Sequence, residues 1–416
     1  MSPGGAKQGR GGAATDRKKL LFVLDDANYT SGAQNATAAV IRALLPTFEI
    51  DLFSLAAPGE RAKTLFAGAG WLQVPTLADA LCLTKPATEV LPGRQYSLSQ
   101  KWLKMRQGLS ILLGRQNAFT EKVFLSLLKT PFERYDTVVT VSEASQFRGV
   151  VAALDGPRKV QWIHTDYARW RDISRWTRGV TARDGTLYER FDRIVTLSRR
   201  CRDDFSALYP HLAEKTVAIR NLVDCAAIRQ RAGEPLALTP PEAPLHIVSV
   251  GRAEGEKNFD WAIDFSKRLR AEGLRVHWTV VGGGRLLPQL RQRAEAEGVF
   301  GELWFAGPLE NPLPLVKQAD LFVLLSRYEG TPATIDEALC LGVPVLATAV
   351  GGVPEQVQDG KTGLLAPPEK EPLYAALRRL CGGEKETLAA FRAQLRGYRA
   401  PREESLARLH QLFEEG

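Results

Sequence analysis

The sequence alternates short apolar runs with amphipathic windows from residue 20 nearly to its end, and this alternation restricts the fold more than any other feature. Runs such as Leu20–Leu24 and Leu321–Leu325 have the length and composition of buried parallel strands. Strands that alternate with helical windows are typical of parallel α/β layers. The pattern therefore predicts an α/β fold in which helices cover both faces of each sheet.

The chain has 416 residues, which is too long for a single hydrophobic core and suits two domains. A proline-dense segment interrupts the alternation before it resumes at residue 245, so this segment is interpreted as a linker. The predicted organisation is a disordered tail (1–18), an N-terminal domain (19–233), a linker (234–244), a C-terminal domain (245–395) and a final helix (396–416).

The net charge and the cysteine content indicate which kinds of partner and which cellular compartment suit the chain. The formal net charge of +8 favours anionic partners such as phosphates, nucleic acid or acidic lipid, without choosing among them. The five cysteines are scattered and show no C-x-x-C spacing, so neither a disulfide framework nor a zinc site is expected. A reducing cytoplasm fits this usage. No apolar stretch is long enough for a secretory leader or a membrane span.

The segment that follows the strand at 321–325 carries the strongest chemical signal. Glu329 lies in the loop after the strand, and Thr331-Pro332 predicts the start of a helix that continues past Glu337. Free amides at a helix start bind anions, whereas carboxylates accept hydrogen bonds from hydroxyls. A sugar nucleotide offers both groups. Alternatively, Glu329 merely ends the strand and Glu337 is a solvated helix residue.

A second group follows the predicted strand at 246–250. Gly251 allows a close backbone approach, and the side chains of Arg252 and Lys257 can hold a diphosphate. As isolated residues they would be ordinary surface charges. The run Gly282-Gly-Gly284 after the next strand is not the dinucleotide fingerprint, so hydride transfer loses its main support.

The N-terminal half contributes two further candidates. Gly32, in the predicted loop 26–34 before a helix at 35–45, could approach a ligand or could be an ordinary turn glycine. His164 lies at the exit of the predicted strand 159–164, which is where such sheets bind ligands, although a lone histidine is more often packed.

Residues 84–129 are helical and basic, and they interrupt the alternation. The stretch can rest on an anionic membrane surface, or it can be a helical insertion with solvated charges. Its cations and apolar residues include Arg94, Lys101, Trp102, Lys104, Met105, Arg106, Leu109, Leu112, Arg115 and Lys122.

Taken together, these residues resemble the retaining glycosyltransferases of family 4, whose GT-B architecture has two Rossmann-like domains facing a cleft. The resemblance extends over most of the chain and is densest after residue 245. It is carried by Val250-Gly-Arg252 with Glu256-Lys257-Asn258, Gly282-Gly-Gly284, Ser326-Arg-Tyr-Glu-Gly330, Gly342-Val-Pro-Val345, Gly351-Gly-Val-Pro-Glu355 and Asp359-Gly-Lys-Thr-Gly363. The local pattern is similar to bacterial members that build capsule, lipopolysaccharide or exopolysaccharide.

The resemblance implies a role for each candidate. Arg252 and Lys257 would hold the donor diphosphate beside Gly251 and stabilise the departing nucleotide. Glu337 would bind the ribose, Glu329 would contact the donor hexose, and His164 would lie near the transferred sugar. Backbone from Gly330 through Thr331, Pro332 and Ala333 to Thr334 would support the sugar and β-phosphate, and Gly32 would approach the diphosphate. A final helix at 402–413 would cross back onto the N-terminal domain.

Two positions depart from the family pattern. Ala33 stands where the N-terminal loop usually has a second glycine, and Leu222 stands where a glycine usually follows Asn221. The chain also has no Asp-x-Asp pair to hold a divalent ion on the diphosphate, so metal-independent chemistry without a cofactor is expected.

The sequence thus predicts a retaining transferase that moves a hexose from a nucleotide-diphosphate sugar to a lipid-linked or saccharide acceptor. It would act in the cytoplasm, with contact to the inner face of the membrane left open. The alternatives are a nucleotide-sugar epimerase or hydrolase of the same fold, and a catalytically silent sugar-nucleotide binder. A nucleic-acid partner is disfavoured because the basic excess is diffuse and no binding motif accompanies it.

Overall fold

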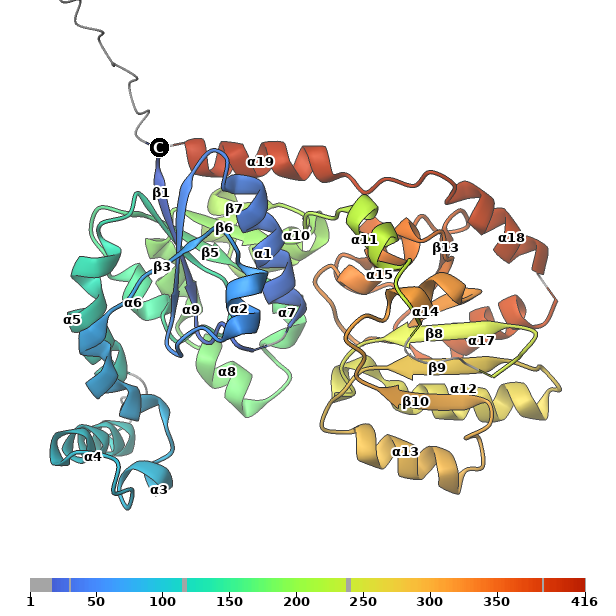
Figure 1. Cartoon of the computed structure of the whole chain (residues 1–416), viewed down its shortest axis with the longest axis horizontal. Coiled ribbons are helices and arrows are strands. Elements are labelled where there is room, and N and C mark those ends of the chain that lie inside the picture. The colour runs from blue at the N-terminus through green and yellow to red at the C-terminus, as the bar shows by residue number, and fades with distance from the viewer. Residues whose placement is uncertain (1–16, 30, 114–117, 237–240, 384, 416) are drawn as a thin grey trace, which may run out of the picture.

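Two all-parallel sheets, each covered by helices on both faces, form the two halves of the protein (Figure 1). The structure is a computed structural model that describes residues 17–29, 31–113, 118–236, 241–383 and 385–415. The predicted tail up to residue 16, the cation Arg115 and residues 237–240 of the predicted linker lie outside this described part. The α/β layers expected from the alternating pattern are confirmed, as is the two-domain GT-B architecture that the family resemblance implies.

The N-terminal half contains a seven-stranded sheet of order β3-β2-β1-β4-β5-β6-β7. The order reverses between β1 and β4, and crevices at such a switch point are where doubly wound sheets bind ligands. The strands are β1 (Lys19–Leu24), β2 (Glu49–Ser54), β3 (Gly70–Trp71), β4 (Thr137–Thr140), β5 (Arg158–Trp162), β6 (Arg193–Thr196) and β7 (Thr216–Ala218).

The C-terminal half contains a six-stranded sheet of order β10-β9-β8-β11-β12-β13, with its switch point between β8 and β11. The strands are β8 (His246–Val250), β9 (His277–Val281), β10 (Leu303–Gly307), β11 (Leu321–Leu324), β12 (Val345–Thr348) and β13 (Gly363–Ala366). Strands β8 and β11 match the predicted runs at 246–250 and 321–325 to within a residue.

Helices connect the strands of each sheet. In the first part of the chain they are α1 (Gly32–Leu44), α2 (Glu60–Leu65), η1 (Pro75–Thr84), α3 (Ala87–Val90), α4 (Leu98–Leu112), α5 (Ala118–Phe132), α6 (Arg148–Ala152), α7 (Tyr167–Trp170), α8 (Arg175–Thr181), α9 (Asp184–Leu187), η2 (Tyr188–Arg190), α10 (Arg199–Leu208), η3 (Pro210–Lys215) and α11 (Cys225–Arg231). In the second part they are η4 (Gly255–Lys257), α12 (Phe259–Ala271), α13 (Leu287–Ala296), α14 (Leu313–Gln318), α15 (Ala333–Cys340), α16 (Val353–Gln356), α17 (Lys370–Cys381), α18 (Lys385–Gln394) and α19 (Arg402–Glu414).

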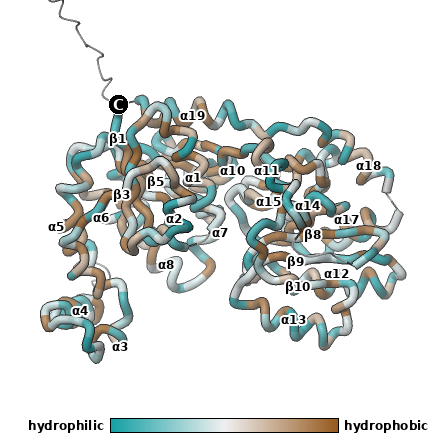
Figure 2. Tube along the Cα trace, viewed as in Figure 1, coloured by the Kyte–Doolittle hydropathy of each residue, from teal (hydrophilic) through white to brown (hydrophobic). Residues whose placement is uncertain are grey.

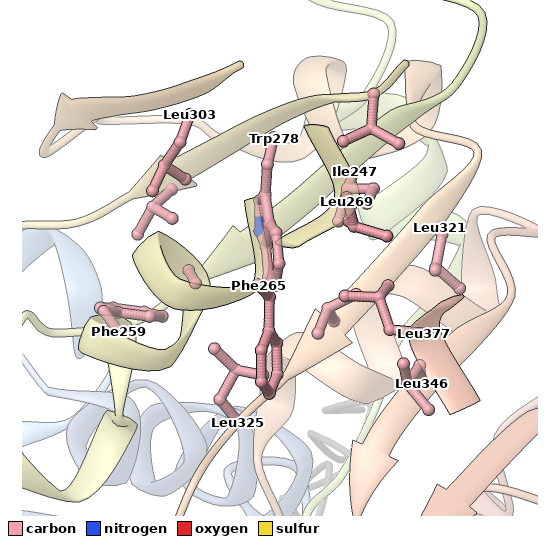
Figure 3. Close-up of a cluster of buried hydrophobic side chains, with 14 of the residues drawn as sticks. Ile247, Phe259, Phe265, Leu269, Trp278, Leu303, Leu321, Leu325, Leu346 and Leu377 are labelled. Carbon is pink, nitrogen blue, oxygen red and sulfur yellow. The ribbon is translucent and has the colours of Figure 1, made fainter. Parts of the chain in front are cut away.

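Apolar side chains are buried on both faces of each sheet, as a parallel sheet requires. In the C-terminal half, Trp278 and Phe265 lie at the centre of one cluster (Figure 3). The indole N–H of Trp278 donates a hydrogen bond to the Ser249 hydroxyl oxygen at 3.0 Å, and that hydroxyl donates to the Val323 carbonyl at 2.6 Å. Both buried polar groups on β8 and β9 therefore have hydrogen-bond partners, which offset the cost of removing them from water.

The chain passes between the halves twice. Helix α11 packs against α14 and α15 of the C-terminal half, so the first crossing lies at residues 220–224, upstream of the predicted linker. Helix α19 returns to the N-terminal half, where Leu409, Leu412 and Phe413 enter the core beneath β1 and β2 (Figure 1).

Several local predictions need correction. Strands β2, β3 and β13 were not predicted. Helix α1 starts at Gly32 rather than residue 35, because the Ser31 hydroxyl accepts from the Gln34 amide and caps the helix there. Helix α15 starts at Ala333 with Pro332 as its N-cap, and Thr331 does not cap it, because its hydroxyl oxygen accepts from Asn221 instead. No helix within the described ranges combines the length and apolarity needed to span a membrane.

Candidate active site

Loops at the carboxyl ends of strands from both halves meet one another. A side chain added at Gly330, after β11, would place its first carbon 2.2 Å from the carbonyl oxygen of His164, which follows β5. The amide of Asn221, beyond β7, donates to the carbonyl and hydroxyl oxygens of Thr331, each at 3.2 Å. Gly330 therefore lies against the backbone of His164, Thr331 contacts Asn221, and the N- and C-terminal halves contact each other at this edge.

Lys257 and Glu329 form an ion pair at the centre of this region, although 72 positions separate them in sequence. Both side chains are largely buried, with relative exposures of 15% and 13%. The Ser326 hydroxyl donates to the same Glu329 oxygen at 2.6 Å. A largely buried cation is thus held beside a carboxylate that lies between the end of β11 and the start of α15.

Arg252 extends from the loop after β8 towards the N-terminal half. Its guanidinium donates to the Tyr29 hydroxyl oxygen at 3.2 Å and to the Glu256 carboxylate at 3.3 Å. The Lys257 side chain lies along Gly251, with its Cε 3.5 Å from where a side chain would begin there. Gly251 and the Lys257 side chain are thus in van der Waals contact. Arg252 lies one residue further along the chain and has an exposed side chain.

Helix α15 carries the remaining C-terminal candidates. Ala333 and Thr334 form its first turn, and Glu337 follows one turn later. Burial raises the pKa of Glu337 to about 7, and the neighbouring Asp336 charge adds to this shift, whereas Arg231 opposes it. The carboxyl of Asp336 is also shifted, its pKa rising to about 6 through burial, and it lies 3.6 Å from the Arg220 guanidinium.

His164 follows β5 by two residues, and its ring stacks on Trp162 with the centroids 6.2 Å apart. Its backbone N–H donates to the Glu143 carboxylate at 3.0 Å. Burial lowers the pKa of the imidazole to about 4, so the ring is neutral near pH 7. Its Nε2 is buried and has no hydrogen-bond partner. Together with Trp162 and Asn221, the ring lines a narrow crevice that has no room for a water molecule.

Gly32 is the first residue of α1, and no atom lies within 4 Å of where its side chain would begin. Within the described part of the chain, no hydrogen bond joins it to the C-terminal candidates. Direct contacts thus connect the segment Glu329–Thr331 with Lys257 and with His164. Gly32 lies apart from these residues, at the start of α1.

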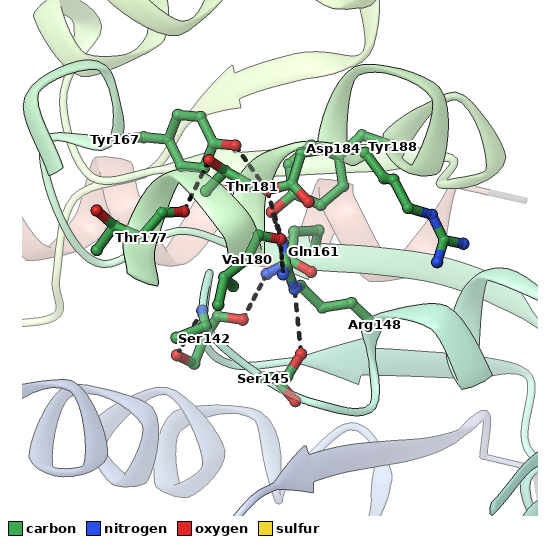
Figure 4. A network of polar contacts seen from close by, with 12 residues as sticks. Ser142, Ser145, Arg148, Gln161, Tyr167, Thr177, Val180, Thr181, Asp184 and Tyr188 are labelled. Carbon is green, nitrogen blue, oxygen red and sulfur yellow. Dashed lines mark hydrogen bonds and ion pairs between the residues drawn. The ribbon is translucent and has the colours of Figure 1, made fainter. Parts of the chain in front are cut away.

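A buried polar network holds the segment after His164 in place (Figure 4). The Arg148 guanidinium donates to the Asp184 carboxylate at 2.6 Å and to the Tyr188 hydroxyl oxygen at 3.0 Å, and the Tyr167 hydroxyl donates to the same carboxylate at 2.6 Å. Such a paired and hydrogen-bonded charge fixes geometry more than it adds stability. The network positions α7 to α9 beside the edge where the halves meet.

The sequence prediction missed several residues that connect the halves. Glu355 accepts a hydrogen bond from the backbone N–H of Arg200 at 2.9 Å, and its carbonyl accepts from Arg220 at 3.2 Å. Arg169 donates to the Arg327 carbonyl at 3.2 Å. Glu355 lies in the Gly351–Glu355 motif after β12, so the sequence marked this position as a candidate. The sequence did not show that Glu355 contacts Arg200, because that contact depends on how the two halves face each other.

The structure corrects the expectation that the cysteines form no disulfide. Cys225, the first residue of α11, is bonded to Cys340, the last residue of α15, with their Cα atoms 5.2 Å apart. The two lie 115 positions apart, so no spacing pattern could indicate the pair. Among the described residues, Cys82, Cys201 and Cys381 are free. The same part of the chain contains no cluster of three His, Cys, Asp or Glu side chains arranged to hold a metal.

The architecture is similar to that of solved glycosyltransferase structures. The chain aligns with the solved structure of Anabaena HepE in complex with UDP-glucose at a TM-score of 0.65 and 17% identity, covering 95% of this chain and 98% of that one. At this identity the likeness shows the fold, which is that of the GT-B glycosyltransferases.

The amino-acid sequence matches two protein-family models. Residues 97–227 match the model described as "Glycosyltransferase Family 4", and residues 244–382 match "Glycosyl transferases group 1". The chain belongs to the family 4 glycosyltransferases of GT-B fold, and several of the relatives that it matches are named for polysaccharide biosynthesis.

Two curated relatives illustrate this membership. The glycogen synthase of Mycobacterium tuberculosis is 33% identical over 215 residues, which cover 49% of this chain and 50% of that protein. A putative colanic acid biosynthesis glycosyltransferase, WcaL of Salmonella typhimurium, is 30% identical over 172 residues, covering 39% and 41%. The chain thus matches about half or less of the length of these curated relatives.

Proposed function

We propose that this protein is a retaining, metal-independent transferase that moves a hexose from a nucleotide-diphosphate sugar to a lipid-linked or saccharide acceptor in cell-surface polysaccharide synthesis. The observation that carries the proposal is the buried Lys257–Glu329 ion pair, which lies directly before α15 at the edge where the two halves meet. A cation, a carboxylate and a helix start in one place match the groups of a sugar diphosphate.

Lys257 would exchange its carboxylate partner for the donor diphosphate. The incoming phosphate oxygens compete for the ammonium group, and Glu329 is then released to accept hydrogen bonds from hexose hydroxyls. Arg252, one residue beyond Gly251, adds a second cation from the exposed side. Charge develops on the leaving nucleotide as the bond to the sugar breaks, and fixed cations stabilise that charge.

The other candidates would orient the donor. Glu337, one turn into α15, would accept from the ribose hydroxyls when ionised, while the backbone of Gly330 to Thr334 supports the sugar and β-phosphate, with Pro332 and Ala333 opening the helix. The neutral His164, with its unpaired Nε2, would donate to or accept from the transferred sugar. Gly32 is the first residue of α1 and has no atom within 4 Å of where a side chain would begin, so the diphosphate could approach its backbone from the N-terminal half.

The proposed donor class is supported by the HepE neighbour, which was solved with UDP-glucose. The proposed acceptor class is supported by the colanic acid relative. We propose that transfer takes place in the cytoplasm. An epimerase or hydrolase of the same fold would act on the donor without an acceptor, so product analysis with the donor alone separates that alternative from transfer.

The test has two stages. A thermal-shift panel of nucleotide diphosphates and nucleotide hexoses identifies the donor, because a ligand that binds only the folded state raises the unfolding temperature. Sugar transfer to extracted lipid-linked acceptor is then measured for Lys257→Ala and Glu329→Gln. We expect both variants to lose about 100-fold or more in rate, since each removes a charge that acts on the reacting groups.

Matched controls are Lys361→Ala and Glu310→Gln, which change exposed residues of the same types that are not among the candidate site residues. Unchanged transfer by both site variants would refute the assigned roles. Loss of activity in a chelator, restored by manganese, would refute metal independence. The anomeric configuration of the product, determined by NMR, decides retention.

A further inference from the structure

Helix α4 contacts the protein through Leu103 and several polar side chains, and most of its large apolar side chains face outward. The Lys104 ammonium group is buried and donates to the Leu83 carbonyl at 3.1 Å and to Gln107 at 2.6 Å. Gln107 donates to the same carbonyl at 3.0 Å and to the Thr120 hydroxyl oxygen at 2.7 Å. This is the reverse of an ordinary surface helix, whose apolar stripe faces the core.

The outward face of α4 is a continuous apolar stripe. Its members recur at intervals of four and three residues, which places them on one side of a helix. We call this set the α4 stripe: Leu98, Trp102, Met105, Leu109 and Leu112, with relative exposures of 86%, 53%, 54%, 58% and 85%. Such an aligned set of exposed large apolar side chains marks an interaction surface.

Cations border the stripe on both sides. At 100° per residue, Lys101 lies about 60° to one side of Leu98 and Arg106 about 80° to the other. The Arg106 guanidinium is 4.6 Å from the centre of the Trp102 ring. The sequence of α4 contains no Asp or Glu. In Figure 1, α4 lies with α3 at the end of the N-terminal half away from the C-terminal half, and Figure 2 shows apolar residues among the polar ones of this helix.

We infer that the α4 stripe docks onto the surface of an anionic phospholipid bilayer. A helix with an apolar face, flanking cations and an interfacial tryptophan lies in the plane of a bilayer, with its apolar side chains among the acyl chains and its cations at anionic headgroups. A second copy of this chain fits less well, because two such faces would bring Lys101 and Arg106 against like charges with no acidic residue in α4 to pair them.

This inference adds the docking surface to the proposed function, and its test does not depend on that function. The full chain is floated with vesicles of phosphatidylcholine alone and of phosphatidylcholine with 30% phosphatidylglycerol, without donor or acceptor. We expect binding to the anionic vesicles that weakens in high salt. Failure of sugar transfer would leave this result standing, and failure to bind vesicles would leave the transfer proposal standing.

Two variants locate the surface. Leu98→Ser combined with Leu112→Ser should weaken vesicle binding about tenfold or more, because both side chains leave the acyl region. Both are almost fully exposed, so the unfolding temperature should not change. Lys101→Gln should weaken binding to anionic vesicles only. The matched controls are Phe300→Ser and Lys317→Gln, which alter an exposed apolar residue and an exposed cation of the C-terminal half.

Three results would overturn the inference. The first is absence of binding to anionic vesicles. The second is equal binding by the Leu98→Ser, Leu112→Ser variant and the Phe300→Ser control. The third is a dimer in solution that the Leu98→Ser, Leu112→Ser variant converts to monomers, because the stripe would then be an interface between copies of the chain.

Discussion

The carboxylate of Glu355, in the C-terminal half, accepts a hydrogen bond from the backbone N–H of Arg200 at 2.9 Å, in the first turn of α10 of the N-terminal half. An acidic side chain at a helix start satisfies a free amide and opposes the positive end of the helix dipole. Here that acid is supplied by the opposite half of the protein. A contact usually made within one helix therefore joins the two halves beside the candidate active site.

Glu355→Ala should weaken this junction. We expect kcat/KM for sugar transfer to fall about tenfold, which corresponds to roughly the loss of one charge-assisted hydrogen bond. Glu355→Gln, which keeps an acceptor oxygen, should lose less. Small-angle scattering should show a wider range of overall dimensions for the alanine variant. Identical kinetics and scattering for Glu355→Ala and the exposed control Glu310→Ala would contradict this role.

Gly330→Ala should prevent the halves from meeting. Its added carbon would lie 2.2 Å from the His164 carbonyl oxygen, a distance that backbone atoms cannot relieve without moving apart. We expect a loss of transfer of about 100-fold or more, because small displacements at a catalytic site have effects of that size. Gly301→Ala is the control, since nothing lies within 4 Å of its added carbon. Normal turnover by Gly330→Ala would show that the working state lacks the contact.

Glu337 should make the protein less stable as pH rises. Its pKa is about 7 in the folded state and 4.5 in the unfolded state, so between those values the folded state binds more protons. The free energy of unfolding therefore falls as pH increases through this window. Glu337→Gln should remove this dependence and be more stable than wild type at pH 8 by about 1–2 kcal/mol after screening. Thermal denaturation at pH 5 and pH 8 measures the difference, and parallel curves for both proteins would contradict it.

The Cys225–Cys340 disulfide should raise stability under oxidising conditions. In the chain-entropy view, closing a loop of this length contributes about 4–5 kcal/mol. Cys340→Ser should therefore unfold at a lower temperature than wild type and should no longer respond to a thiol reductant, whereas Cys381→Ser should behave as wild type. Peptide mapping without reduction should recover the two linked peptides. Complete alkylation of both cysteines in the unreduced protein would count against the bond.

The fold and the C-terminal half of the site could be predicted because their signals are local. Strands such as β8 and β11 are continuous apolar runs, and Lys257, Glu329 and Glu337 follow them at fixed places. Strand β2 (EIDLFS) is interrupted by acidic residues and β13 (GLLA) starts with a glycine, so neither is the continuous apolar run that marked strands such as β8 and β11.

The missed relationships are those between distant residues. Thr331 was expected to cap α15, but its oxygen accepts from Asn221, which is 110 positions away. The disulfide and the Glu355–Arg200 contact likewise depend on how the halves face each other. The cations of α4 were visible in the sequence, but only the packing shows that Lys104 points inward while Leu98 points outward.

The return of α19 has a consequence for how this protein can be divided. Leu409 and Phe413 pack with Phe22 and Phe48. The last fifteen residues therefore supply part of the hydrophobic core of the N-terminal half. At the two crossings, Arg402 lies 3.6 Å from Asp224. A single proteolytic cut near residue 235 should thus release no free fragment, and a C-terminal deletion would expose aromatic rings in the opposite half and lead to aggregation.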